Sequence, residues 1–250
     1  MDEATIAGIK EELGGDLGKE AAKRCRVIGW TAFDHYAQLK ERFSPADREK
    51  LLSALNLDLQ ERVYVHFTQN THPDCLYLKA TSFTPEQKSL EFDYEVRVTK
   101  AVFAAASDLG IRLVVKPHPG EAHSIDTTAD LVKRYGFTYI PARACNTQQL
   151  MLAADSVTAG RSTCLTEACL LDRNAGGIFT EEIGKSWMKA FPPIVLEAIP
   201  YALEWEEVAG VIRTVTSSDA LNLERLANER GKFSVDGKAS QRVAELIERL

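Results

Sequence analysis

From residue 62 onward, short apolar runs rich in β-branched residues alternate with longer segments of helical periodicity. The pattern predicts strands at 62–67, 111–115, 137–141, 155–159 and 174–179. It predicts helices between them at 90–110, 127–136, 146–154 and 162–171. This alternation indicates right-handed βαβ crossovers, so we expect an α/β fold: a Rossmann-like open parallel sheet with helices on both faces. The remainder, from residue 204 to residue 250, is predicted to form a helical C-terminal tail.

The chain before residue 62 shows weaker patterns. Residues 4–15, ATIAGIKEELGG, have helical spacing and end at a glycine pair, and residues 25–30, CRVIGW, form a short apolar run. Ser44 followed by Pro45 predicts the start of another helix, because serine caps helices and proline suits the first helical position.

The composition of the chain argues against several classes of function. The 250 residues carry a net charge of −6, which argues against a nucleic-acid or membrane-surface partner. No apolar run approaches the roughly 18 residues of a transmembrane helix, and the acidic N-terminus lacks a signal-peptide core, so we expect a cytoplasmic protein. The cysteines form no CxxC pair, which favours free thiols over zinc; they are Cys25, Cys75, Cys145, Cys164 and Cys169.

The most unusual motif is RLVVKPHPGEAH, residues 112–123. Pro117 cannot donate to a sheet and so ends the strand, while Pro119 favours an extended backbone at His118. Ligands of open parallel sheets bind outside the carboxyl ends of the strands. We therefore expect His118, with Lys116 close by, to face a ligand; the alternative is a loop histidine that bonds the neighbouring backbone.

A second candidate lies in DSVTAGRSTCLTEACLL. Gly160 is expected to make the turn after a strand, and a helix is expected to begin at Ser162 or Thr163. Free N–H groups, the helix dipole and two hydroxyls favour an anion there, and Arg161 would add charge. Glu167, one turn along, is placed to accept from a ribose diol. The alternative is an ordinary cap followed by a solvated acid.

Two other loops bear on function. After the strand at 137–141, the backbone groups of Ala142 and Arg143 are placed to read a base edge, although an ordinary surface loop fits equally well. GGIFTEEIGKS ends like a phosphate-binding loop, but the spacing from Gly177 to Gly184 does not fit that motif.

The segments VVKPHPGE, YIPA followed by QQLMLAADSV, and TAGRSTCLTEACLL together resemble the carboxyl-terminal, donor-binding domain of two-domain GT-B glycosyltransferases. The similarity is greatest to CDP-glycerol glycerophosphotransferases, capsule and sialic-acid transferases, and UDP-N-acetylglucosamine 2-epimerases. The resemblance implies that Glu167 binds the ribose and that Ala142 and Arg143 frame the base. The phosphate-binding residues would be Lys116, His118, Gly160, Arg161, Ser162 and Thr163.

The resemblance also implies a domain organisation. Residues 1–25 would be an N-terminal helical extension or remnant, 26–61 a connector, and 62–250 the Rossmann-like nucleotide-binding domain. The acceptor-binding amino-terminal domain of these families has no counterpart here, because about 25 residues precede the connector. We therefore expect a partner chain or a missing N-terminal domain to bind the acceptor, or self-association through exposed aromatic residues at Trp30, Phe33 and Tyr36.

Three functions follow. The leading one is the nucleotide-sugar or nucleotide-alditol donor-binding half of a glycosyltransferase-like enzyme, which needs no cofactor beyond that donor and no metal, and which transfers nothing as this chain alone. A 2-epimerase-like enzyme is an alternative, but those enzymes carry a basic, glycine-containing loop where this chain has TQNTHPD, with His72. The third is a non-catalytic nucleotide-binding module.

Overall fold

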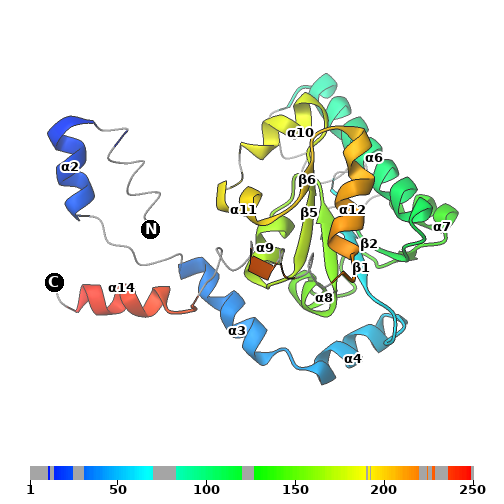
Figure 1. Cartoon of the computed structure of the whole chain (residues 1–250), viewed down its shortest axis with the longest axis horizontal. Helices are drawn as coiled ribbons and strands as arrows, with labels where there is room; N and C mark the ends of the chain where they lie inside the picture. The colour runs from blue at the N-terminus through cyan, green and yellow to red at the C-terminus, as the bar shows by residue number, and fades with distance from the viewer. Residues whose placement is uncertain are drawn as a thin grey trace. The chain divides into compact units, whose positions relative to one another are not determined.

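The computed structural model describes residues 14–24, 31–69, 83–119, 127–189, 193–219 and 236–248, with the single positions 11, 191, 224, 227 and 228 (Figure 1). The chain forms two compact units. The terminal unit comprises Met1–Arg42 and Ser234–Leu250, and the sheet unit comprises Phe43–Phe233. The predicted boundaries at residues 25 and 61 differ from these, since the predicted connector is divided between the units and the last helix of the predicted tail joins the N-terminal segment. The apolar run at 25–30 and most of the predicted helix at 4–15 lie outside the described residues.

The sheet unit contains a six-stranded sheet in the order β3-β2-β1-β4-β5-β6, with every neighbouring pair parallel. The strands are β1 (Tyr64–Phe67), β2 (Leu113–Lys116), β3 (Thr138–Tyr139), β4 (Ser156–Ala159), β5 (Asn174–Ile178) and β6 (Tyr201–Ala202). Five of the six match predicted strands, and β6 lies in a stretch for which no strand was predicted. This is the strand order of the doubly wound Rossmann fold, so the predicted fold class is confirmed.

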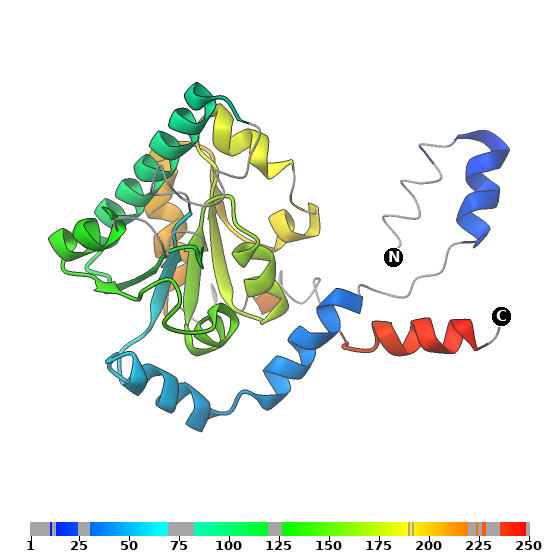
Figure 2. The same ribbon diagram turned by 180° about the vertical axis from the view of Figure 1, so that it is seen from behind.

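Helices cover both faces of this sheet (Figures 1 and 2). One face carries α6 (Pro85–Asp108), α7 (Thr127–Tyr135) and α12 (Val208–Thr216). The other carries α8 (Thr147–Ala153), α9 (Cys164–Leu170) and α11 (Pro193–Ala198), with α4 (Pro45–Ala54) packed on α8. After β5 the chain forms α10 (Glu181–Met188), and the short 3-10 helix η3 (Trp205–Glu207) precedes α12.

A buried apolar core packs α6 and α12 against one face of the sheet. Tyr94, Val98 and Val102 recur every four residues along α6 and are buried against β1, β2 and α12. Helix α12 approaches β5 very closely at Gly176, where a Cβ atom would lie 2.6 Å from Val211 Cγ1. A larger residue at this position would require the Val211 side chain to move. The loops at the carboxyl ends of the strands are therefore held on a closely packed base.

Side-chain caps mark the first residues of α4 and α6. Ser44 and Asp47 form a capping box with Pro45 in the first turn of α4, as the sequence predicted for Ser44 and Pro45. Thr84 and Gln87 form the same arrangement at the start of α6. Both caps satisfy backbone N–H groups that would otherwise lack partners at a helix start.

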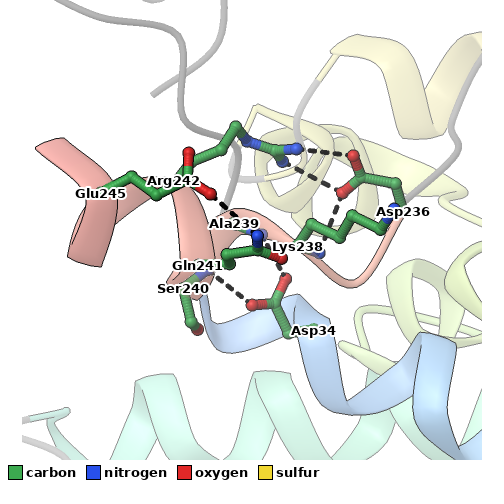
Figure 3. Close-up of polar contacts among 8 residues, drawn as sticks. All are labelled: Asp34, Asp236, Lys238, Ala239, Ser240, Gln241, Arg242 and Glu245. Atoms are coloured by element: carbon green, nitrogen blue, oxygen red, sulfur yellow. Dashed lines mark hydrogen bonds and ion pairs between the residues drawn. The ribbon is translucent and has the colours of Figure 1, made fainter.

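In the terminal unit, the carboxylate of Asp34 joins the N-terminal segment to the last helix. The unit contains α2 (Gly15–Arg24), the 3-10 helix η1 (Thr31–Phe33), α3 (Asp34–Arg42) and α14 (Ala239–Ile247). Figure 3 shows Asp34 accepting from the backbone N–H of Ala239 at 3.0 Å and of Ser240 at 2.7 Å. Burial raises the pKa of Asp34, but hydrogen bonds from Ser240 and Ala239 and the charge of Arg242 outweigh it, so the pKa lies below its ordinary value.

The aromatic residues expected to be exposed near the start of this unit are placed differently. Tyr36 is buried, with 8% of its surface exposed, and its ring packs edge-on against the half-buried Phe33. Trp30 lies outside the described residues. Tyr36 is therefore not available for self-association, because it takes part in packing of the protein itself.

Among the described residues, no helix is both long enough and apolar enough to cross a bilayer. Cys145, Cys164 and Cys169 are not in disulfides, whereas Cys25 and Cys75 lie outside the described residues.

We predict that Asp34→Ala weakens the start of α14 by about 1 kcal/mol, because two backbone donors lose their acceptor. Hydrogen exchange at the amides of Ala239 and Ser240 measures this. Asp34→Asn keeps an acceptor and should protect them, and Asp47→Ala, at the cap of α4, is the control. Because folding lowers the pKa of Asp34 below 3.8, the stabilisation is present above that pH and is lost as the pH falls through the folded pKa. Unchanged exchange in Asp34→Ala would contradict the assigned cap.

Candidate functional site

A cleft of about 510 Å³ lies at the carboxyl edge of the sheet. Five loops contribute to it, those that follow β1, β2, β3, β4 and β5, so it crosses the point where the strand order reverses between β1 and β4. Its lining residues are Gln69, His118, Pro119, Asn146, Thr147, Gln148, Arg161, Ser162, Thr163, Cys164, Glu167 and Trp187. Five predicted site residues are thus brought together: His118, Arg161, Ser162, Thr163 and Glu167.

His118 follows β2 by two residues, framed by Pro117 and Pro119, and its side chain is exposed in the cleft. Partial desolvation and, secondly, the nearby charge of Lys116 lower the pKa of His118 below its ordinary 6.5. At neutral pH the imidazole is therefore uncharged and offers one N–H donor and one acceptor nitrogen.

Lys116 does not reach the cleft. It is the last residue of β2, only 1% exposed, and its Nζ donates to the carbonyl oxygen of Ala142 at 2.7 Å. Burial lowers the pKa of this amine. Instead of facing a ligand, Lys116 fixes the loop between β3 and α8 to the end of β2, because its hydrogen bond joins the two.

The two residues expected to frame a base, Ala142 and Arg143, do not line the cleft. Ala142 is buried, and its carbonyl is engaged by Lys116, while Arg143 is exposed and is not part of the cleft lining. Their loop contributes Asn146 and Thr147 instead. Asn146 Oδ1 accepts from two backbone N–H groups at the start of α8, so its side chain serves as the N-cap of that helix.

The loop between β4 and α9 presents hydroxyls to the cleft. The Ser162 N–H donates to the carbonyl oxygen of Gly160 at 2.9 Å, and Ser162 Oγ accepts from the Cys164 N–H at 3.3 Å. Thr163 is the N-cap residue of α9, but its side chain makes no capping bond. Gly160 has no positive φ, and a Cβ atom there would make only ordinary contacts, so the turn does not depend on glycine.

Arg161 lies beneath this loop in a buried ionic cluster. Its side chain is 1% exposed, its Nε donates to Glu95 Oε1 at 2.7 Å, and its Nη1 pairs with Glu91. The guanidinium also lies over the ring of Trp187, 5.1 Å from its centroid. Although Arg161 was expected to add positive charge for a phosphate, two carboxylates on α6 already balance its charge.

Glu167 forms one wall of the cleft. Its Oε1 accepts from Thr163 Oγ1 and its Oε2 from Gln148 Nε2, each at 3.3 Å. Both bonds are long, so they orient the carboxylate without holding it tightly, and a stronger donor can replace either one. Within the described ranges, no three His, Cys, Asp or Glu side chains are grouped as a metal site.

Sequence reasoning did not identify Gln148, Trp187, Glu91 or Glu95. Two acids four residues apart, in line with the buried Val98 and Val102, lie on the apolar stripe of α6, and that position predicts a buried basic partner. Gln148 and Trp187 belong to helices whose place beside the cleft depends on the tertiary fold, so no local pattern reveals them.

No protein-family model matches this chain, and no curated protein matches its sequence. Solved structures of the wall teichoic acid polymerase TagF are similar in fold. A histidine-to-asparagine variant gives a TM-score of 0.51 at 17% identity, with 91% of this chain and 52% of that chain covered. The same variant soaked for 30 minutes with CDPG gives 0.51 at 14% identity, with 91% and 51% covered, and a histidine-to-alanine variant gives 0.51 at 16%, with 91% and 52% covered.

This chain has a Rossmann-like α/β fold that is similar to the fold of these TagF structures. At this level of identity the likeness concerns the fold alone. The chain spans about half the length of the TagF structures that it matches.

We predict that Arg161→Ala lowers the free energy of unfolding by about 3–5 kcal/mol, because Glu91 and Glu95 would remain buried without their counter-charge. Urea denaturation measures the change. The control is Arg97→Ala, which breaks an exposed bidentate pair between α6 and Glu181 and should cost under about 1 kcal/mol. If the two variants lose equal stability, the buried cluster is not the strong constraint described here.

Proposed function

We propose that this chain is the donor-binding half of a glycosyltransferase-like enzyme and that it binds a nucleotide-linked sugar or alditol. The observation that carries the proposal is the convergence of His118, Ser162, Thr163 and Glu167 on one cleft at the carboxyl edge of the sheet. In open α/β sheets this edge is where nucleotides bind.

In this proposal the phosphates lie between the loops that follow β2 and β4. His118 donates from one side, and the hydroxyls of Ser162 and Thr163 donate from the other. Glu167 accepts from the ribose hydroxyls, which replace its long bonds to Thr163 and Gln148. These groups would stabilise the negative charge that builds on the leaving nucleotide, so this half acts by positioning and electrostatics and supplies no nucleophile.

The donor class follows from chemistry and from the TagF comparison together. One TagF structure that shares the fold was soaked with CDPG, so CDP-glycerol is the first donor to test. Because this chain spans about half of TagF, we propose that a further domain or a partner chain binds the acceptor. Such a surface would also exclude water from the cleft, as transfer requires.

We predict that the wild-type chain binds a nucleoside diphosphate and that His118→Ala weakens this binding tenfold or more. A hydrogen bond to a charged phosphate contributes about 1.5–3 kcal/mol, and His118 is exposed, so its removal should barely alter stability. Calorimetric titration with CDP, UDP, GDP and ADP measures the affinity. His35→Ala, in the terminal unit, is the control and should bind normally. Equal affinity of His118→Ala and the wild type would refute the assignment.

We predict that Glu167→Gln reduces the preference for ribonucleotides over 2′-deoxyribonucleotides. A carboxylate accepts from both hydroxyls of a diol, whereas an amide offers one oxygen, so about tenfold of the preference should be lost. Paired titrations with CDP and 2′-deoxy-CDP, or with the diphosphates of the base that binds best, measure the ratio. Glu182→Gln, on the exposed side of α10, is the control. An unchanged ratio in Glu167→Gln would mean that Glu167 does not contact the sugar.

A further inference from the structure

Contacts between the lining residues give the cleft a direction. Gln148 on α8 bonds to Glu167 on α9, and Glu167 also bonds to Thr163 in the loop between β4 and α9. Arg161 of the same loop contacts Trp187 on α10. A ligand that lies along the cleft therefore meets Gln148 and Trp187 with different parts of its structure.

This direction assigns the ends of the donor, on the basis of the proposed function. Glu167 bonds to Gln148 and Thr163, so the ribose belongs beside these residues, and the phosphates belong beside His118 and Ser162. In a nucleotide-linked sugar the transferred group is attached on the far side of the phosphates. It then lies on the side of the phosphates away from Glu167, where Trp187 lines the cleft beside Arg161.

Trp187 is held in place before any ligand arrives. The Arg161 guanidinium lies over the indole at 5.1 Å from the ring centroid, and Glu91 and Glu95 hold Arg161 from α6. The indole is half-buried and lines the cleft, so part of the ring remains accessible. An aromatic surface fixed in this way suits the C–H face of a sugar or polyol, because contact costs little side-chain entropy.

We infer that Trp187 is a specificity-determining residue that packs against the transferred sugar or alditol of the donor. The Arg161 cluster positions the indole. Trp187 takes no part in binding the nucleotide itself.

The experiment compares the affinities for a nucleoside diphosphate and for its sugar or alditol conjugate, using CDP with CDP-glycerol, UDP with UDP-N-acetylglucosamine, and GDP with GDP-mannose. We expect Trp187→Leu to weaken binding of the preferred conjugate about tenfold, or about 1.4 kcal/mol, and to leave the parent nucleotide unchanged. Trp187→Phe keeps a ring and should retain most of the affinity. Trp205→Phe, which changes an indole packed near Tyr94 outside the cleft lining, should alter neither affinity.

The outcomes separate this inference from the proposed function. If the wild type binds none of the six compounds, the proposed function is wrong and the inference with it. If the wild type binds nucleotides but Trp187→Leu weakens nucleotide and conjugate equally, or weakens neither, the proposed function stands and the role of Trp187 is refuted. Thermal unfolding of each variant shows whether it is folded, and Trp187→Phe gives the same comparison if Trp187→Leu is not.

Discussion

The candidate site depends on the contacts of the Arg161 guanidinium with Glu91, Glu95 and Trp187. The guanidinium joins three elements that no backbone hydrogen bond connects: the long helix α6 through Glu91 and Glu95, the loop between β4 and α9, and helix α10 through Trp187. Three charges removed from water are tolerated only when each is paired. The loop that carries Ser162 and Thr163 is therefore fixed to the core beneath it as well as to the strand before it.

The two basic side chains nearest the cleft both have internal partners. Lys116 donates to a carbonyl of the β3–α8 loop, and Arg161 is enclosed by carboxylates, so each positive charge organises a loop of the protein. Apart from Arg161, the donors that line the cleft are uncharged and include an imidazole, hydroxyls and side-chain amides. If the proposed ligand binds here, its recognition depends on hydrogen-bond geometry, with little contribution from a positive field, which agrees with the net charge of −6.

The sequence correctly predicted the structural features that depend on neighbouring residues. The alternation of strands and helices, the capping of α4 by Ser44 and the position of His118 just beyond β2 all depend on neighbouring residues, and the sequence predicted each of them. The directions of Lys116 and Arg161 depend on partners 26 and 66–70 residues away, and a charged residue near a strand end has no local preference for ligand or core. For the same reason Trp187 was not recognised, because only the folded chain brings α10 to the cleft. The sequence did not predict the two-residue β6, although it predicted the equally short β3.

The bond between Asp34 and the start of α14 has a consequence for synthesis. It joins positions 205 and 206 residues apart, and the whole sheet unit, Phe43–Phe233, lies between them in the sequence. As the chain leaves the ribosome, the carboxylate emerges early and its two amide donors emerge only after every strand has been made. The sheet unit can fold while translation continues, whereas the terminal unit must wait for the last helix. In order of assembly, the sheet unit is an insertion that folds before the unit into which it is inserted.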